Sequence, residues 1–562
     1  MPRMTGKRAL LEQLVADGVQ YIFGNPGTTE QGFMDALQDY PQLQFLLALH
    51  EGVAVPMADA YARLTRKPAF VELHVTPGLG NGLGMIHNAR VGQSPLVIYA
   101  GQSESEALLQ EPHLSGPLVE MARPLCKWAY QIEHAHDVPQ ALRRAFKVAA
   151  DPPQGPVFLS LPIDVLDQEG EVDIRPTSYT NWQARPDPSA LSQVADLLLA
   201  ARNPMIMAGD RVALSGAQTE LVALAELLGA PIFENYASEF NLPTAHPLNL
   251  GAIPFTGGPN QLRSTLADCD VLLAVGAPLF QVIFPQPTNP VLAPGTKLIQ
   301  VDLVAWELNK NIPADFALLA DPKATLLELA DLVRAGQTAS GRQAAAARTT
   351  SITERTAASR QRYWDSTRAR WDATPISAPR LMHELREVLP ADALVFSEAS
   401  SNQAHVHAAL QPAVPDRLMN SRGGGIGPGL PGTLGAQLAR PDRPVVGLCS
   451  DGAAMYSISA LWTAAHHRIP ATFVMLGNAS YRVLKLNMIE YLGADVAEDR
   501  RFVGMDLTDP ALRFDLLAEA MGVPARRVEQ PDALREALKE AISHRGPFLV
   551  DVVMDSPLPT IK

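Results

Sequence analysis

Short apolar runs alternate with stretches of helical periodicity along most of the chain. The segment "VQYIFGNPGTTEQGFMDAL" (19–37) is typical of a strand, a turn and a helix, and "FLLALHEGVAVPMADAYARLT" (45–65) repeats the scheme. Further apolar runs such as "PLVIYAGQ" (95–102) supply more strands. Strands that alternate with helices in this way predict a parallel sheet covered by helices on both faces.

Two interruptions divide this pattern into three parts. A polar, proline-containing stretch (168–188) indicates a linker, and an Ala/Thr/Arg-rich stretch (336–362) indicates an exposed helical connector. We therefore predict an α/β protein with three consecutive domains, each built on an open parallel sheet. The predicted units are an N-terminal domain (1–175), a central domain (189–335), a connector (336–377) and a C-terminal domain (378–562).

Composition narrows the class of protein. The chain has 562 residues, 47% of them hydrophobic and 19% charged, which suits a globular protein with several cores. A net charge of −13 argues against nucleic acid and anionic membranes as partners. The three cysteines, Cys126, Cys269 and Cys449, are too far apart for a disulfide framework or a zinc pattern. With no signal-peptide pattern and no run of 18 apolar residues, we expect a cytoplasmic enzyme.

Polar residues directly follow several of the predicted strands. Glu51, His74, Glu398, Asp451 and Asn478 each come after an apolar run. Ligands of open parallel sheets bind beyond the carboxyl ends of the strands. The shared placement of these five residues is the first indication of a functional site.

Asp451 and Asn478 form the most informative pair. Asp451 lies in "SDG" after the apolar run 445–448, and Asn478 lies in "GN" after the run 473–476. Two oxygen ligands with a single charge suit Mg²⁺, which commonly completes its shell with phosphate oxygens. A helix starting near Ala453 would direct its N-terminus at the same point and attract phosphate. Taken alone, Asp451-Gly452 would more often be an ordinary turn, and Asn478 an ordinary helix cap.

The spacing of "SDG" and "GN" resembles the signature of thiamin-diphosphate enzymes, commonly written GDG…NN, with Ser450 and Gly477 as the two departures. The wider chain is similar to the benzoylformate decarboxylase branch of that family. The stretches "FGNPGTTE", "LALHEGVAVPMADAYA", "SRGGGIGPGLPGTLGAQLA" and "YSISALWTAAHHRIPATFVM" carry this similarity. It implies thiamin diphosphate and Mg²⁺ as cofactors, with a pyrimidine-binding, a middle and a diphosphate-binding domain in that order.

The resemblance also implies roles for individual residues. Asp451, Asn478 and the carbonyl of Ser480 would hold the metal. Glu51 would be the catalytic acid that donates to the aminopyrimidine ring, a role that suits a dry pocket; a plain helix-start glutamate is the alternative. Further residues implied at the cofactor are Ser397, Glu398, Ala399, Ser400, Gly424, Ile426, Gly452, Ala453, Ala454 and Tyr481. Because the family places its cofactor between two chains, we expect a homodimer or homotetramer with active sites at the subunit interface.

The residues expected to contact the substrate differ more from those of the benzoylformate decarboxylases than the cofactor residues do. His74 matches a histidine that benzoylformate decarboxylases use in proton transfer, and Thr28 stands in place of a carboxylate-binding serine. A second active-site histidine is replaced by Ile283, and His113 in "QEPHLSG" is a candidate substitute. Two more residues expected to line the substrate pocket are Val483 and Asn487.

The resemblance leaves two reactions open. The first is a 2-oxo acid decarboxylase that passes through an enamine and releases an aldehyde. The second is a carboligase or lyase of the acetolactate synthase or aldehyde lyase type, which makes or breaks a C–C bond next to a carbonyl. No flavin signal stands out, and FAD in the central domain stays an open alternative. A non-catalytic scaffold would be expected to lose Glu51 or Asp451, and both are present. A dehydrogenase is also disfavoured, because the G-x-G-x-x-G match at 427–432 lacks the preceding strand of a nicotinamide-binding site.

Overall fold

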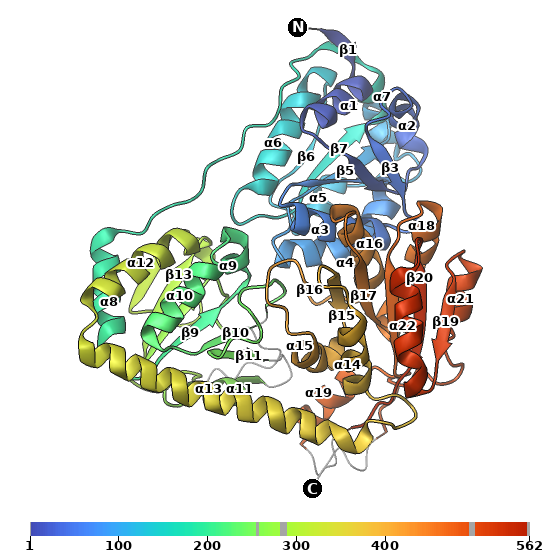
Figure 1. Cartoon of the computed structure of the whole chain (residues 1–562). Helices are drawn as coiled ribbons and strands as arrows, with labels where there is room; N and C mark the ends of the chain where they lie inside the picture. The colour runs from blue at the N-terminus through green and yellow to red at the C-terminus, as the bar shows by residue number, and fades with distance from the viewer. Residues whose placement is uncertain (1, 236, 254–257, 281–288, 494–500, 559–562) are drawn as a thin grey trace.

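The computed structural model describes residues 2–235, 237–253, 258–280, 289–493 and 501–558 of the 562. It contains three six-stranded parallel sheets, one in each third of the chain, and confirms the predicted α/β fold class (Figure 1). A short antiparallel pair, β1 (Arg3–Thr5) and β8 (Glu169–Glu171), ties the two ends of the N-terminal domain together.

The first and third sheets share one topology. The first has the order β3-β2-β4-β5-β7-β6 and the third the order β16-β15-β17-β18-β20-β19. The strands of the first are β2 (Tyr21–Gly24), β3 (Gln44–Leu47), β4 (Ala69–Leu73), β5 (Leu96–Gln102), β6 (Ala129–Gln131) and β7 (Val157–Pro162). Those of the third are β15 (Leu394–Glu398), β16 (Leu418–Asn420), β17 (Val445–Ser450), β18 (Thr472–Gly477), β19 (Ala525–Val528) and β20 (Phe548–Val553). Strand order therefore reverses between β2 and β4 in one sheet and between β15 and β17 in the other, where ligands of such sheets bind.

The central sheet has a different order, β11-β10-β9-β12-β13-β14. In chain order this is 3-2-1-4-5-6, which is common among dinucleotide-binding sheets. Its strands are β9 (Pro204–Ala208), β10 (Ile232–Asn235), β11 (Asn249–Ile253), β12 (Val271–Val275), β13 (Lys297–Asp302) and β14 (Phe316–Leu319).

Helices cover the sheets on both sides (Figure 1). Those of the N-terminal domain are α1 (Gly6–Ala16), α2 (Gln31–Leu37), α3 (Glu51–Thr65), α4 (Val75–Val91), α5 (Leu118–Ala122), α6 (Val138–Ala150) and α7 (Ile163–Asp167). Those of the central domain are α8 (Pro188–Ala200), α9 (Asp210–Ser215), α10 (Gln218–Leu228), α11 (Gly258–Leu266) and α12 (Pro322–Gly336). The C-terminal domain contains α14 (Ala378–Val388), α15 (Gln403–Leu410), α16 (Gly429–Ala439), α17 (Asp451–Ala454), α18 (Ala460–His466), α19 (Arg482–Leu492), α21 (Phe514–Ala520) and α22 (Leu534–Ser543).

The stretch predicted to be an exposed connector contains α13 (Ala339–Thr367), which runs along the base of the central and C-terminal domains (Figure 1). Most of its side chains are exposed, and Ala345, Ile352 and Thr356 are buried. No helix in the described part of the chain combines the length and apolarity needed to span a membrane.

The N-terminal and C-terminal domains share one hydrophobic core. Val53 and Met57 of α3 are buried in the same cluster as Leu430 and Leu434 of α16. The two helices approach so closely that a Cβ atom on Gly435 would lie 2.0 Å from the carbonyl oxygen of Met57. These contacts between α3 and α16 hold the two domains together, because each Å² of buried apolar surface contributes about 25 cal/mol to stability.

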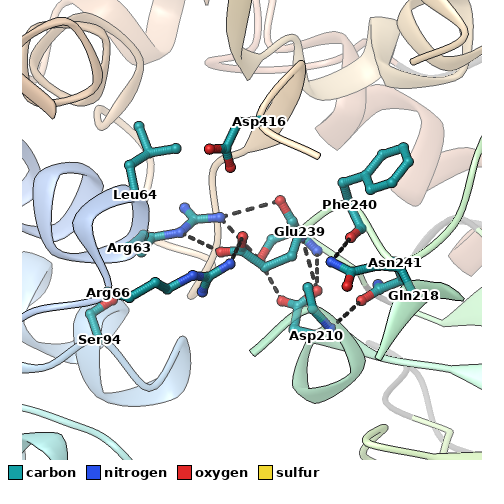
Figure 2. Close-up of polar contacts among 12 residues, drawn as sticks. Arg63, Leu64, Arg66, Ser94, Asp210, Gln218, Glu239, Phe240, Asn241 and Asp416 are labelled. Atoms are coloured by element: carbon teal, nitrogen blue, oxygen red, sulfur yellow. Dashed lines mark hydrogen bonds and ion pairs between the residues drawn. The ribbon is translucent and has the colours of Figure 1, made fainter. Parts of the chain in front are cut away.

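A buried charge cluster joins all three domains. Figure 2 shows Arg63 and Arg66 of the N-terminal domain directed at Glu239 of the central domain. Arg63 Nε lies 2.8 Å from Glu239 Oε1, and Arg63 Nη1 donates to the carbonyl of Asn420 at 3.0 Å. Burial raises the pKa of Glu239, but the charges of Arg63, Arg66 and Arg422 outweigh it and lower the pKa to about 2. The cluster therefore depends on an ionised Glu239.

We expect Glu239→Gln to destabilise the protein by about 3–5 kcal/mol, because it leaves buried guanidinium groups without their counter-charge. Since the folded pKa of Glu239 is depressed, its stabilisation is present above pH 4.5 and is lost as the pH falls toward about 2. Urea unfolding measured with and without the substitution tests this. Glu540→Gln, which removes an exposed pair with Arg526, is the control and should change stability far less. Equal losses in the two variants would contradict the prediction.

Candidate active site

The N-terminal half of the site lies at the point where strand order reverses in the first sheet. The loop after β2 carries the 3-10 turn η1 (Thr28–Glu30), and His74 directly follows β4. Glu51 is the first residue of α3 and is only 5% exposed. Its Oε2 atom accepts a hydrogen bond from Nδ2 of Asn81 on α4 at 3.0 Å. The predicted catalytic acid is therefore buried and held from a neighbouring helix.

His74 is paired with a glutamate that the sequence did not single out. His74 Nδ1 lies 2.8 Å from Oε2 of Glu30, a fully buried residue. The other oxygen of Glu30 accepts from the backbone of Gly101 at 2.8 Å and from Oγ1 of Thr29 at 2.7 Å. The hydrogen bond to Glu30 raises the pKa of His74, against the opposing effect of burial. His74 therefore keeps its imidazolium proton to higher pH than an unpaired histidine does.

In the loop that carries Thr28, the neighbouring residue Thr29 lies closer to His74. Thr28 is exposed, whereas the hydroxyl of Thr29 lies 3.5 Å from His74 Nδ1. A Cβ atom on Gly27 would lie 2.1 Å from the same ring nitrogen, so only glycine leaves room for the imidazole. The Gly27-to-Glu30 spacing, with Glu30 accepting from the Gly27 amide at 3.0 Å, is a helix-start pattern that could have revealed Glu30.

A third carboxyl group, Glu72, is enclosed beneath these residues. It lies within β4, is fully buried, and faces Gly24 of β2, where a Cβ atom would be 2.4 Å from Glu72 Oε2. Burial raises the pKa of Glu72 well above 4.5, the charges of Glu30 and Glu51 raise it further, and only the Asn25 backbone amide opposes them. The protonated form of Glu72 is therefore favoured over a wider pH range than that of an exposed glutamate.

Glu72→Gln tests this assignment through the pH dependence of stability. The unfolded chain releases the proton near pH 4.5, whereas the folded protein keeps it to higher pH. The free energy of unfolding therefore falls by about 1.4 kcal/mol for each pH unit in this window. We expect the variant to lose that slope and to be more stable than wild type at about pH 7, measured by urea unfolding.

Glu133→Gln, at an exposed position, is the matched control, and its stability should follow the wild-type curve at every pH. A Glu72→Gln curve that also follows wild type would show that Glu72 is ionised in the folded protein.

The C-terminal half of the site lies at the ends of β17 and β18, which are adjacent and parallel, with Ser450 opposite Leu476. Asp451 is 4% exposed, and its Oδ2 atom accepts from the backbone amide of Ala479 at 2.6 Å. Burial raises the pKa of Asp451 to about 6, against the effect of the surrounding backbone amides. The Asp451 carboxyl is thus directed at the turn that carries Asn478.

The same turn holds the other two predicted metal ligands. Asn478 Oδ1 accepts from the backbone amide of Ser480 at 3.1 Å, and Ser480 is 7% exposed. Ring atom Cε1 of Tyr481 would lie 2.5 Å from a Cβ atom on Gly452, so glycine is needed where the tyrosine packs over the Asp451 turn. Asp451, Asn478 and Ser480 therefore lie together at one turn, and their role as metal ligands stays a prediction.

The helix expected after Asp451 is interrupted. The structure has a four-residue helix, α17, in which Ala453 and Ala454 are buried, and α18 begins only at Ala460. Between them, Ser457 Oγ donates to the carbonyl of Gly427 at 2.6 Å, which draws this segment toward the glycine-rich loop. His467, directly after α18, accepts at Nε2 from the Leu47 amide at 2.9 Å, a contact between the C-terminal and N-terminal domains.

The glycine-rich segment 421–428, here called the cradle loop, carries Ile426, which is 37% exposed. The carboxyl of Glu398 accepts from the backbone amides of Gly427 at 2.8 Å and Gly429 at 2.7 Å. Burial raises the pKa of Glu398 to about 7, against these two hydrogen bonds. Gly424 has φ +92° and open space where a Cβ atom would be, so a ligand can approach its backbone. Glu398 thus holds the end of the cradle loop through the backbone amides of Gly427 and Gly429.

The remaining residues predicted near the diphosphate differ in exposure. Ser397 and Ala399 are buried, and Ser397 Oγ donates to Oε1 of Gln403 at 2.9 Å. Ser400 is exposed and has φ +47°, which turns the chain outward after β15. Of these three, Ser400 is the one whose side chain is open to a ligand.

The remaining predicted substrate residues come from α19 and from the loop that carries His113. Val483 and Asn487 lie on α19, half-buried, and Oδ1 of Asn487 is buried without a hydrogen-bond partner among the described residues. His113 is exposed in a loop whose Gly116 carbonyl accepts from Nε2 of Gln102 at 3.0 Å. A Cβ atom on Gly116 would be 2.4 Å from Thr76 Oγ1, so this loop lies against the start of α4 near His74. Ile283 lies outside the described residues.

The side chains present suit Mg²⁺ and a diphosphate. Within the described residues, no group of three or more His, Cys, Asp or Glu side chains could hold a metal ion. Asp451, Asn478 and the Ser480 carbonyl offer instead one carboxylate and two neutral oxygens, which leave coordination positions for phosphate. Burial raises the pKa of Asp451, and a divalent ion bound to its carboxylate would oppose that effect.

Comparison with known sequence families covers all three domains. Residues 4–117 match "Thiamine pyrophosphate enzyme, N-terminal TPP binding domain", 191–329 match "Thiamine pyrophosphate enzyme, central domain", and 398–552 match "Thiamine pyrophosphate enzyme, C-terminal TPP binding domain". The three matched segments lie in the three sheet-containing domains in chain order; the first ends before β6 and β7, and the third begins at the last residue of β15.

Whole proteins of this kind align along nearly the full chain. Benzoylformate decarboxylase of Pseudomonas aeruginosa is 33% identical, over 97% of this chain and 98% of its own. A probable acetolactate synthase large subunit of Methanocaldococcus jannaschii is 28% identical, over 98% of this chain and 92% of its own. The solved structure of the thiamine diphosphate-dependent 4-hydroxybenzoylformate decarboxylase of Rhodococcus jostii superposes with a TM-score of 0.84 at 29% identity, covering 99% of this chain and 100% of its own. Because the family models match all three domains and a relative at 33% identity aligns along nearly the whole chain, the chain belongs to the thiamine pyrophosphate enzymes.

Proposed function

We propose that this protein is a thiamin diphosphate- and Mg²⁺-dependent decarboxylase that converts a 2-oxo acid into an aldehyde and CO₂. The observation that carries the proposal is the His74–Glu30 pair, 2.8 Å apart, in the same half-site as the buried Glu51. A 2-oxo acid brings a carboxylate, which pairs with an imidazolium, and its product requires a proton, which an imidazolium can deliver.

In this proposal the chain's own residues have distinct tasks. When bound, thiamin diphosphate supplies the electron sink that decarboxylation requires. Asp451, Asn478 and the Ser480 carbonyl hold the Mg²⁺ ion that anchors the diphosphate. Ile426 supports the coenzyme from the cradle loop. Glu51 holds a proton for the ring nitrogen of the aminopyrimidine, and its burial excludes competing water.

The substrate contacts follow from the half-site around His74. Thr28 is exposed beside this half-site and could donate its hydroxyl to the substrate carboxylate. His113, also exposed, would act as a second proton donor in place of the histidine that Ile283 replaces. Val483 and Asn487 would line the substrate's side chain. The amide oxygen of Asn487, which has no hydrogen-bond partner among the described residues, favours a substrate with a hydrogen-bond donor.

We further propose that the active site forms between subunits of a homodimer or homotetramer. Large apolar side chains are exposed beside both half-sites: Leu49, at 48%, lies two residues before Glu51, and Tyr456, at 61%, lies five residues after Asp451. Exposed apolar residues grouped around a functional site are typical of protein–protein interfaces. A cytoplasmic location stays a prediction.

A carboligase or lyase of the acetolactate synthase type is the second candidate, supported by whole-length similarity to such a subunit. FAD in the central domain would accompany this alternative, because the order of the central sheet is that of dinucleotide-binding folds. A yellow purified protein would favour it.

One experiment separates the two candidates. The protein is loaded with thiamin diphosphate and Mg²⁺ and given a panel of 2-oxo acids, alone and with aldehydes. The proposal predicts CO₂ and free aldehyde in equal amounts, whereas a carboligase would yield coupled products, resolved by mass spectrometry. A sample stripped with EDTA is the control. Absence of turnover on every 2-oxo acid would contradict both.

A further inference from the structure

The cradle loop is held by a residue of the N-terminal domain. Asn88, near the end of α4, donates from Nδ2 to the carbonyl of Gly425 at 2.8 Å and accepts at Oδ1 from the amide of Gly425 at 2.9 Å. Asn88 is 3% exposed, and 337 residues separate it from Gly425. One side chain therefore satisfies both backbone groups of the residue that precedes Ile426.

The packing around this contact leaves no room for a side chain at Gly423 or Gly425. A Cβ atom on Gly423 would lie 2.3 Å from Asn88 Cα, and one on Gly425 would lie 2.8 Å from Asn88 Oδ1. The chain leading into the loop is fixed by the charge cluster of Figure 2, through Arg63 and the carbonyl of Asn420 at 3.0 Å. The chain entering the cradle loop thus contacts α3 through Arg63, and the middle of the loop contacts α4 through Asn88.

Ile426 lies between two clamps from different domains. Asn88 holds Gly425 on one side, and Glu398 of the C-terminal domain holds Gly427 and Gly429 on the other. A glycine-rich segment has many accessible conformations and a high entropy cost of ordering. Without one clamp, the loop would adopt the conformation that presents Ile426 for only a fraction of the time.

We propose that Asn88 is a positioning residue for the coenzyme: it holds the cradle loop in the conformation that receives the aminopyrimidine ring. The inference rests on the proposed function, in which Ile426 supports thiamin diphosphate. Asn88 touches neither coenzyme nor substrate in this scheme, so its effect is on coenzyme affinity.

The test compares three variants for thiamin diphosphate affinity at saturating Mg²⁺ by fluorescence titration, and for thermal stability without cofactor. Asn88→Ala removes both hydrogen bonds, and Asn88→Asp keeps the acceptor for the Gly425 amide. Arg440→Gln is the control: it removes the 2.9 Å hydrogen bond from Arg440 to the Leu64 carbonyl, between the same two domains but at the far end of α16.

We expect Asn88→Ala to raise the Kd for thiamin diphosphate about tenfold, since apparent affinity falls in proportion to the binding-competent fraction of the loop. Asn88→Asp should fall between Asn88→Ala and wild type, and Arg440→Gln should stay within about twofold. The KM for the 2-oxo acid, measured at saturating coenzyme, should not change.

If Asn88→Ala and Arg440→Gln have the same Kd, Asn88 only joins the domains and the inference is wrong. Should Asn88→Ala fail to fold, an unchanged Kd for Asn88→Asp leads to the same conclusion. A wild-type chain that does not bind thiamin diphosphate would instead refute the proposed function itself.

Discussion

Glu51→Gln should lower kcat by about 10²–10⁴-fold while thiamin diphosphate still binds. The amide keeps the shape of Glu51 and can accept from Asn81, but it has no acidic proton to transfer to the aminopyrimidine ring. Because Glu51 lies in a buried pocket, water cannot easily replace it. Steady-state kinetics combined with a coenzyme titration checks both halves of the prediction.

Glu171→Gln, an exposed substitution in β8 of the same domain, is the matched control and should leave kcat unchanged. If Glu51→Gln retained most of the wild-type turnover, Glu51 would be a helix-start residue without a catalytic role.

Asp451→Ala should weaken thiamin diphosphate binding by at least about 100-fold, because it removes the charged ligand of the proposed Mg²⁺ site. The thermal stabilisation of wild type by coenzyme and Mg²⁺ together should disappear. Isothermal titration at several Mg²⁺ concentrations measures this effect. Coenzyme affinity in Asp451→Ala that still rises with Mg²⁺ as in wild type would place the metal elsewhere.

The apo protein offers a second readout of the same residue. Burial raises the pKa of Asp451 from 3.8 to about 6, so the free energy of unfolding falls as the pH rises between these values. Asp451→Asn removes that titration, and its apo form should be at least as stable as wild type above pH 6. A gain in apo stability with a loss of cofactor binding identifies a residue retained for function.

The sequence predicted the fold because its strands are short and apolar and alternate regularly with helices. All five residues of β4 are buried, as are most residues of β17, and both strands therefore stand out as apolar runs in the sequence. The closeness of Asp451 and Asn478 was predictable for the same reason, because the two residues follow strands that lie side by side.

Other parts of the site depend on contacts between distant segments. Asn88 and Gly425 are 337 residues apart, and neither belongs to a pattern that names the other. Glu72 interrupts an apolar strand, and its significance comes only from its position beside Glu30 and Glu51. The break between α17 and α18 follows from Ser457 binding the cradle loop, a tertiary contact that outweighs local helical periodicity.

Mixing two inactive variants tests the central claim that the two half-sites meet across a subunit interface around one metal-anchored coenzyme. Chains carrying Glu51→Gln and chains carrying Asp451→Ala are purified separately, dissociated, combined in equal amounts and reassembled with thiamin diphosphate and Mg²⁺. Random pairing makes half of the dimers mixed, and each mixed dimer has one intact site, so we predict about a quarter of wild-type turnover. Activity no higher than that of either variant alone would contradict the shared site.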